Sequence, residues 1–345
     1  MTRIKTYIVL AAILFAVTLL VPTLLVLPFS EGVESGKLGE ALTQKQNQVA
    51  QSEAVIAPEQ GVEVAVYRTS SQQMETLPLE NYVIGVVASE MPADFEMEAL
   101  KAQALTARTY IVKQMLSQDR VGLPAGADTA DSQIHQVYKN QDELRRIWGS
   151  DYNWKIKRIN QAVQETSGQI LTYNSEPITA TFFSTSNGFT ENSEEYWSNS
   201  FPYLRSVKSP WDKKSPKYTD KKIISIKEFE SKLGVKLANR TSVGTITAKT
   251  AGNRVAKVNI NGKTLTGKEI REKLDLRSTD FTWAVQGENV VISTKGYGHG
   301  VGMSQYGANG MAAEGKNYQQ IVQHYYQGIA ISSSQPLMTK LTAKQ

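Results

Sequence analysis

The segment from Tyr7 to Phe29 contains no charged residue, and it constrains the fold of this chain more than any other feature. A membrane-spanning helix needs about 20 mostly apolar residues, and this segment is long enough. Arg3 and Lys5 precede it, and acidic residues beginning with Glu31 follow it. Because basic residues remain on the cytoplasmic side, we expect residues 7–29 to be a single transmembrane anchor with a short cytoplasmic N-terminus (1–6) and an extracytoplasmic body.

A cleaved signal peptide is the alternative for this segment. Its apolar region would be about 7–15 residues long and would end at small residues suited to cleavage. The observed run is longer, and Leu27-Pro28-Phe29-Ser30 is a poor cleavage context. The sequence therefore favours an anchor that is retained.

Composition excludes several kinds of site. The chain has no cysteine, so thiolate zinc sites and cysteine nucleophiles are ruled out. Its net charge of +5 is modest. On an extracytoplasmic protein this charge fits attraction to an anionic matrix such as a bacterial wall, whereas the aromatic–basic interleaving typical of nucleic-acid binding is missing.

Beyond the anchor, residues 30–60 are rich in Gly, Ser, Gln, Glu and Ala, which predicts a polar stalk. A globular domain is expected at 61–332, with a frayed tail at 333–345. Strands and helices are mixed without a regular βαβ rhythm, so we expect the α+β class, with short antiparallel sheets in a two-lobed body around a central groove. Helices are predicted at 77–90, 98–115, 151–165, 304–314 and 318–327, with further starts at 225 and 266; strands are predicted at 62–67, 169–173, 178–184 and 289–294; and 122–140 is predicted to be a long loop.

The first segment with chemical potential ends at Glu90. On a helix Val83, Val86, Val87 and Glu90 share one face, so the carboxylate lies among apolar side chains. Burial there would raise its pKa, as a general acid requires. An exposed or salt-bridged glutamate at a helix end is the alternative, and position by itself favours it.

Arg108 lies on the mostly apolar face of the next predicted helix. A structural ion pair with an acidic residue is one interpretation. The other is a guanidinium that holds a substrate or the catalytic carboxylate.

Small hydrogen-bonding residues end the predicted strand Thr181–Gly188, among them Ser184, Ser186 and Asn187. Such groups suit sugar hydroxyls, although turn capping explains them equally well. Tyr203, in the following loop, could stack on a sugar face or fill the core.

Glycine occupies every second position from Gly296 to Gly302, which is typical of backbone that approaches a ligand or another chain closely. His299 lies among these glycines and could donate, accept or relay a proton. A hydrolase triad of Ser186 or Ser304 with His299 is disfavoured, because no G-x-S-x-G elbow accompanies it.

These segments in this order, behind an N-terminal anchor, resemble the stage II sporulation protein D family of Gram-positive endospore formers. The strongest matches are Leu79–Pro92, Leu100–Tyr110, Phe183–Gly188 and Gly298–Tyr306. The resemblance implies a lytic transglycosylase that cleaves peptidoglycan glycan strands during engulfment of the forespore. It places the catalytic glutamate at Glu90, which outweighs the alternative that position favours.

By the same resemblance, Arg108, Ser184, Ser186, Asn187, Tyr203, His299 and Gln305 would bind substrate. No cofactor is implied. Some clostridial relatives resemble zinc proteins in the loop after the second helix, but here that loop keeps only His135 and no cysteine, so we expect no metal.

The resemblance also implies a place and partners. The protein would work in the mother-cell engulfing membrane, together with a sporulation amidase (stage II protein P) and a membrane protein (stage II protein M). The main alternative function is a non-catalytic wall-binding module that activates or positions the amidase. A muramidase that uses water is a third possibility.

Overall fold

The computed structural model describes residues 61–342 apart from 118–121, 133 and 240. The chain divides into two compact units, residues 1–55 and 56–345, and every described residue belongs to the second. The predicted anchor and stalk therefore lie outside the described residues. Among those that are described, no helix combines the length and apolar character needed to cross a membrane.

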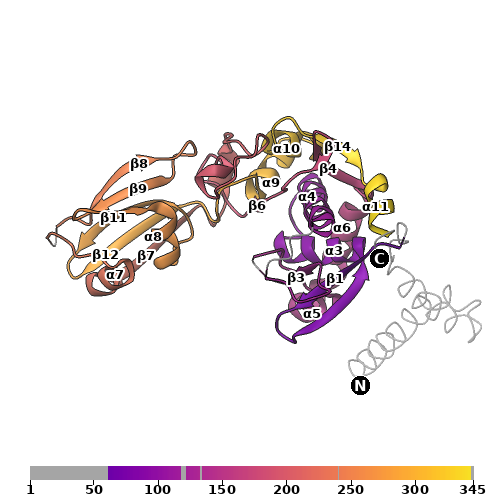
Figure 1. Cartoon of the computed structure of the whole chain (residues 1–345), viewed down its shortest axis with the longest axis horizontal. Helices are drawn as coiled ribbons and strands as arrows, with labels where there is room; N and C mark the ends of the chain where they lie inside the picture. Colours follow the sequence, from indigo (N-terminus) through magenta and orange to yellow (C-terminus); the bar gives the residue numbers. More distant parts are fainter. Residues whose placement is uncertain (1–60, 118–121, 133, 240, 343–345) are drawn as a thin grey trace, which may run out of the picture. The chain divides into compact units, whose positions relative to one another are not determined.

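The described part is an α+β domain of short helices and small sheets, which confirms the predicted class (Figure 1). Its α-helices are α3 (Leu79–Glu90), α4 (Met97–Leu116), α5 (Gln141–Trp148), α6 (Tyr152–Glu165), α7 (Ile226–Leu233), α8 (Gly267–Lys273), α9 (Gln305–Ala313), α10 (Tyr318–Tyr325) and α11 (Gln335–Thr342). Short 3-10 turns are η2 (Gly149–Asp151), η3 (Ser193–Glu195) and η4 (Pro210–Lys214).

The strands of the described residues form five small sheets. They are β1 (Glu63–Arg68), β2 (Gln73–Pro78), β3 (Thr129–Ala130), β4 (Gln169–Tyr173), β5 (Glu176–Pro177), β6 (Phe182–Phe183), β7 (Thr219–Ser225), β8 (Thr245–Lys249), β9 (Val255–Ile260), β10 (Lys263–Thr266), β11 (Asp280–Gln286), β12 (Asn289–Lys295), β13 (Met303–Ser304) and β14 (Ala330–Ser333). The strand orders are β2-β1-β3, β10-β9-β8, β11-β12-β7, β13-β6 and β14-β4-β5. The β1–β3 and β13–β6 pairs are parallel, and the others are antiparallel.

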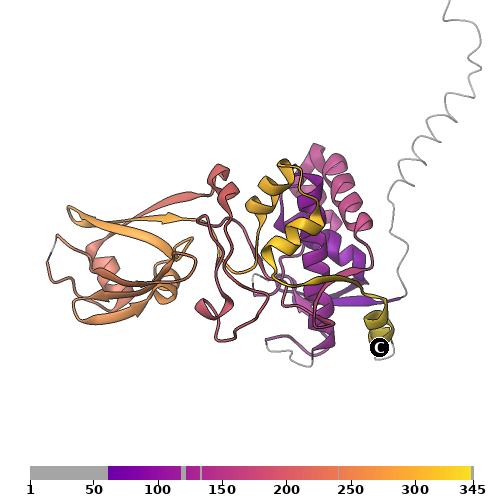
Figure 2. The same cartoon turned by 90° about the horizontal axis from the view of Figure 1, so that it is seen from above.

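Buried apolar side chains gather in two clusters. The first draws on residues 62–204 and 301–341, so the two ends of the described chain share one core. Figures 1 and 2 both show the yellow C-terminal segments beside the indigo and magenta N-terminal ones. The second cluster comes from a single stretch, residues 224–292, which is therefore inserted between the two halves of the first core.

Helix α4 is the centre of the first core, and residues on all of its sides are buried. Leu100, Ala104, Leu105 and Ile111 have no exposed surface, and neither have the polar residues Gln103 and Arg108. The helix is enclosed because it contacts α3, α6, α9 and α10. This packing fixes the end of α3, where Glu90 lies.

An ion pair crosses this core. Arg108 on α4 donates to both carboxylate oxygens of Glu80 on α3, at 2.7 and 2.6 Å, and its side chain is 0% exposed. The same guanidinium donates to the backbone carbonyls of Thr166 (2.9 Å) and Val163 (3.1 Å) at the end of α6. One buried cation thus ties three helices together.

Local turn signals predicted several elements correctly. Asn261 and Gly262 have positive φ (47° and 87°) and join β9 to β10 as the expected hairpin. The Thr266 hydroxyl accepts from the Glu269 backbone N–H at the start of α8 and completes the predicted capping box.

Two predictions were wrong. The segment 178–184 is not one strand, because β5 (Glu176–Pro177) ends before it and only Phe182–Phe183 (β6) within it form a strand. The tail at 333–345 is not frayed over its described part, where α11 buries Met338 and Leu341 in the first core.

We expect Arg108→Met to lower the free energy of unfolding by about 3–5 kcal/mol, because it leaves the Glu80 carboxylate buried without its partner. Urea unfolding of residues 56–345 would measure the change. Lys232→Ala breaks the half-exposed pair with Glu228 on α7 and serves as the control, with an expected loss of under about 1 kcal/mol. Equal losses in the two variants would contradict a structural role for the buried pair.

Candidate active site

Glu90 is the last residue of α3, and its side chain is half-buried. The helix begins after Pro78 and ends because Met91 is extended ahead of Pro92. The preceding turn buries Val83, Val86 and Val87 completely. The sequence prediction of a carboxylate on an apolar helical face is thus confirmed.

Burial raises the pKa of the Glu90 carboxyl above its usual range. One contact opposes this shift, because the backbone N–H of Val137 donates to Oε1 at 2.9 Å and stabilises the charged form. Within the described residues no lysine or arginine pairs with this carboxylate. The group therefore retains a proton at higher pH than an ordinary glutamate.

Gln305, the first residue of α9, brings the C-terminal motif to this site. Its Nε2 donates to the backbone carbonyl of Glu90 at 2.9 Å and lies 3.4 Å from Oε1 of Gln103 on α4. The Gln305 side chain is only 6% exposed. It therefore positions the end of α3, while Ser304 caps α9 through the Gly307 N–H.

Two amides near Glu90 escaped the sequence analysis. Gln103 reaches the site through Gln305, and Gln136 precedes Val137 and accepts a hydrogen bond from the Tyr82 hydroxyl at 3.1 Å. The Nε2 atoms of both glutamines are buried without a hydrogen-bond partner. Only the position of Gln136 within the loop expected at 122–140 could have signalled it.

Ser184 contacts the start of α9 through its backbone. Its backbone carbonyl accepts from the Tyr306 N–H at 3.1 Å, and Tyr306 in turn packs edge-on against Phe95 with ring centroids 5.0 Å apart. The Ser184 side chain remains half-buried. Of the predicted binding residues, Ser184 and Gln305 are thus linked to the elements that frame Glu90.

Ser186 supports the fold from inside. Its backbone N–H and its hydroxyl both donate to the Asp212 carboxylate at 2.8 Å, and Ser209 and Ser304 donate to the same group at 2.5 Å. Because Ser186 is fully buried, the predicted contact with substrate is not supported. The contact of Ser186 and Ser304 with Asp212 also removes both from a serine triad.

Asn187 and Tyr203 are also interior supports. The Asn187 amide donates to the Gly252 carbonyl and to the Asp280 carboxylate, each at 2.9 Å, and so joins the first core to the inserted segment. The Tyr203 hydroxyl accepts from the Thr179 N–H at 3.0 Å, and its ring packs in the first core. Both side chains are buried, which is the alternative that the sequence left open.

Arg108 likewise forms a structural ion pair, which is the first of the two interpretations of its sequence position. Its side chain is fully buried, and its guanidinium contacts Glu80 and the carbonyls at the end of α6. A guanidinium so enclosed cannot reach a glycan in this arrangement. The predicted binding role is therefore replaced by a positioning role for the helix that carries Glu90.

His299 is half-buried among the rings of Phe183, Tyr196 and Trp197, at centroid distances of 5.6, 5.7 and 5.1 Å. Burial, with the nearby cations Arg271 and Arg254, lowers its pKa to about 3. The imidazole is therefore neutral near pH 7. Its Nδ1 accepts the Val301 N–H at 3.1 Å, which leaves Nε2 as the protonated nitrogen.

The alternating glycines explain why this segment packs so closely. A Cβ at Gly302 would lie 2.1 Å from the Thr181 carbonyl oxygen, and one at Gly298 would lie 2.8 Å from Cβ of Phe183. Both glycines have positive φ (81° and 116°). The segment thus approaches another stretch of the chain, which is one of the two reasons predicted for its composition.

The candidate site is thus a carboxyl with a raised pKa at the end of a helix. Amide side chains frame it, and the buried Arg108–Glu80 ion pair supports its helix. The protein is therefore an α+β domain with one candidate acid–base group.

Comparison with known proteins agrees with that class. The family model described as Stage II sporulation protein matches residues 67–173, which include Glu90 and Arg108. The chain is 53% identical to Stage II sporulation protein D of Bacillus subtilis (strain 168) over 342 residues, or 99% of this chain and 100% of that protein. It is 52% identical to the protein of the same name from Bacillus amyloliquefaciens, over 95% of this chain and 96% of that one. The chain belongs to the stage II sporulation protein D family.

A more distant relative is the Amidase enhancer of Bacillus subtilis (strain 168). It is 30% identical over 303 residues, which cover 72% of this chain and 40% of that protein. The chain thus belongs to a sporulation family, and one of its relatives is named for its effect on an amidase.

We expect the stability of the protein to depend on Glu90 and pH. Because the folded-state pKa is raised above the ordinary value of 4.5, the folded chain holds this proton more tightly than the unfolded chain. Its contribution to stability therefore falls as pH rises above that value. Glu90→Gln, which cannot ionise, should become progressively more stable relative to wild type as pH rises from about 4 to about 8.

Urea unfolding of residues 56–345 at several pH values would measure this trend. Glu96→Gln makes the same chemical change at an exposed position six residues away and provides the baseline. A Glu90→Gln difference that stays constant with pH, or that shrinks as pH rises, would contradict the raised pKa.

Proposed function

We propose that the chain is a membrane-anchored lytic transglycosylase that cleaves peptidoglycan glycan strands during forespore engulfment, with Glu90 as the catalytic acid and base. The observation that carries the proposal is the half-buried Glu90 carboxyl, whose pKa is raised by burial and which has no cationic partner among the described residues. Such a carboxyl holds its proton to a higher pH than an ordinary glutamate and can still meet a substrate.

One carboxyl is enough for this reaction. Glu90 donates its proton to the oxygen of the bond between N-acetylmuramic acid and N-acetylglucosamine, and the bond from muramic C1 to that oxygen breaks. The C6 hydroxyl of the same muramic residue then attacks C1 and returns its proton to Glu90. The product is a 1,6-anhydro ring, no water is consumed, and the carboxyl ends as it began. Ordinary glycoside hydrolases need a second carboxylate, either as nucleophile or as base for water.

The framing residues support this assignment by holding Glu90 in place. Gln305 fixes the backbone of Glu90, and the Arg108–Glu80 pair fixes the other end of α3. The Val137 N–H stabilises the carboxylate that forms once the proton has been given away. The neutral His299 is a hydrogen-bonding group or ring support in this scheme, because an imidazole of pKa about 3 is not protonated to imidazolium near pH 7.

The alternative is a wall-binding module that activates or positions an amidase without cutting glycan. The relative named Amidase enhancer favours it. In either case the anchor at residues 7–29 would hold the body at the membrane facing the wall. Both proposals include the predicted partners, stage II proteins P and M.

We expect Glu90→Gln to lower the rate of anhydromuramic product formation by about 10²–10⁴-fold, the usual contribution of a general acid–base group. Incubation with purified peptidoglycan followed by mass spectrometry would measure it. Glu96→Gln is the matched control and should retain activity. Undiminished product from Glu90→Gln would refute the catalytic assignment, and binding without product from wild type would favour the amidase-activating alternative.

We also expect the products to contain no oxygen from the solvent. In water enriched with ¹⁸O, a lytic transglycosylase leaves anhydro ends without label, because the attacking oxygen is the muramic C6 hydroxyl. A muramidase would instead give reducing ends that carry the label. Labelled reducing ends as the main product would overturn the reaction type while leaving Glu90 as the acid.

A further inference from the structure

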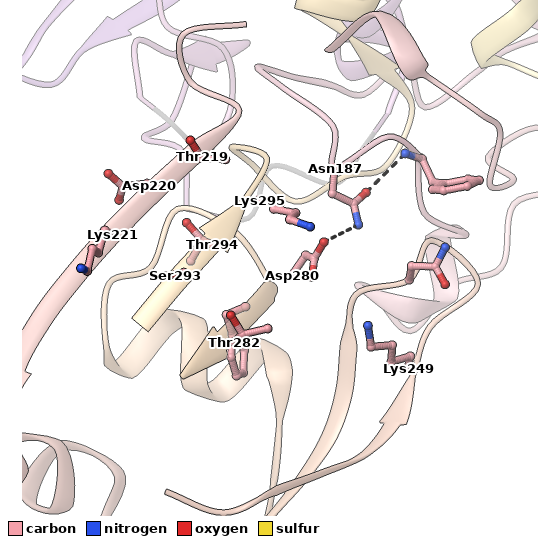
Figure 3. A pocket seen from close by; sticks show the side chains of 13 residues that line it. Asn187, Thr219, Asp220, Lys221, Lys249, Asp280, Thr282, Ser293, Thr294 and Lys295 are labelled. Atoms are coloured by element: carbon pink, nitrogen blue, oxygen red, sulfur yellow. Dashed lines mark hydrogen bonds between the residues drawn. The ribbon is translucent and has the colours of Figure 1, made fainter. Parts of the chain in front are cut away.

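The inserted segment has a hydroxyl- and lysine-lined hollow that the proposed reaction does not use. Its volume is about 810 Å³. Figure 3 shows the strand side chains that line it, with Asn187 and Asp280 joined by a hydrogen bond. The lining residues are Asn187, Phe189, Thr219, Asp220, Lys221, Lys249, Asn253, Asp280, Phe281, Thr282, Ser293, Thr294 and Lys295. Glu90 is not among them.

Sheet β11-β12-β7 provides most of this lining. Its register places Thr282 opposite Ser293 and Ser293 opposite Lys221, so these three side chains form a row across the sheet. The next row is Asp280, Lys295 and Thr219. Alternate residues such as Phe281 and Ile292 point to the second core, which leaves the polar rows on the solvated face.

The cations of the hollow are available, whereas its carboxylates are engaged. Lys221, Lys249 and Lys295 are exposed, and within the described residues none of them has an ion-pair partner. Asp280 accepts a hydrogen bond from Asn187, and Asp220 pairs with Arg277 at 3.3 Å. The lining thus carries three ammonium groups against two carboxylates, one of them paired with Arg277, and an anion would meet ammonium groups from three different strands.

An aromatic ring extends the surface just after β12. Tyr297 is 37% exposed, and its ring lies between two cations, with Lys217 Nζ at 5.5 Å and Arg277 Cζ at 5.2 Å from its centroid. An exposed ring suits the face of a sugar, and flanking cations suit anionic groups carried on that sugar. Lys217, Tyr297 and the hollow thus offer sugar-stacking and anion-binding groups along one stretch of surface.

We propose that this surface is a second, non-catalytic binding site for an extended anionic glycopolymer of the cell wall. The recognised chemistry is a saccharide chain with repeated negative charges, either phosphodiesters or carboxylates of attached peptides. The site goes beyond the proposed cleavage reaction and does not depend on it, because none of its residues contacts Glu90 or the side chains that frame it. Its effect would be to keep the protein on the wall between encounters of Glu90 with a scissile bond.

Binding of the full-length protein, kept in detergent, to purified wall sacculi tests the proposal by co-sedimentation. The variant Lys221→Gln/Lys249→Gln/Lys295→Gln should bind at least about tenfold more weakly than wild type at low salt, and its affinity should depend less on salt. Lys213→Gln/Lys214→Gln/Lys227→Gln removes the same charge from exposed positions outside the hollow and should bind nearly as wild type.

Two treatments of the sacculi identify the anion. If removal of phosphodiester polymers with hydrofluoric acid abolishes the lysine-dependent binding, phosphate is recognised; if removal of peptides with an amidase abolishes it, carboxylate is recognised. Either result supports the proposal. Equal loss in the two triple variants, no loss in the first, or lysine-dependent binding that survives both treatments would overturn it. Glu90→Gln should bind as wild type, which separates this result from failure of the proposed reaction.

Discussion

The carboxylate of Glu80 and the guanidinium of Arg108 meet where α3, α4 and α6 converge, and the rest of the candidate site depends on that contact. Both groups are removed from water, which is costly unless every donor finds an acceptor. Here the guanidinium uses both Glu80 oxygens and the carbonyls of Val163 and Thr166 at the end of α6. The pair therefore holds a unique arrangement of helices, and Glu90 lies nearly three turns along the same helix from Glu80.

A second buried carboxylate, that of Asp212, holds elements of the C-terminal half together. Asp212 accepts from Ser186, Ser209 and Ser304, and Ser209 also contacts the Tyr325 hydroxyl at 2.7 Å. These donors come from segments far apart in sequence, so one carboxylate aligns β6, α9 and α10. The two buried acids are structural, whereas Glu90 differs because it is half-exposed and is held by a single backbone N–H, that of Val137.

How far the sequence could predict the structure follows from where each signal lies. The hairpin at Asn261-Gly262 and the α8 start at Thr266 are local, so a few neighbouring residues determine them. Helix α5 has an equally local capping box at Asn140 and Glu143, and it was missed because no element was assigned between the loop predicted to end at residue 140 and the helix predicted to begin at residue 151. Helix α11 has no such signal. Met338 and Leu341 define it only by packing against a core built mostly from distant residues.

In the candidate site, too, local sequence signals predicted a residue's position, and contacts with distant residues could not be predicted. Helical periodicity placed Glu90 correctly because its burial depends on its own helix. The interior positions of Ser186 and Asn187 depend on Asp212 and Asp280, far along the chain, so residue type indicated hydrogen bonding without indicating the partner.

The contact between Glu90 and the Val137 N–H has a consequence for how this protein can vary over evolutionary time. The donor is a backbone group, so almost any residue at position 137 can supply it, and proline alone lacks it. Side-chain drift in this loop would leave the acid strength of Glu90 intact, whereas a shift of the loop backbone would change it. The pKa of Glu90 thus depends on where the backbone of residue 137 lies. A comparison of side chains at position 137 would not detect a change in it.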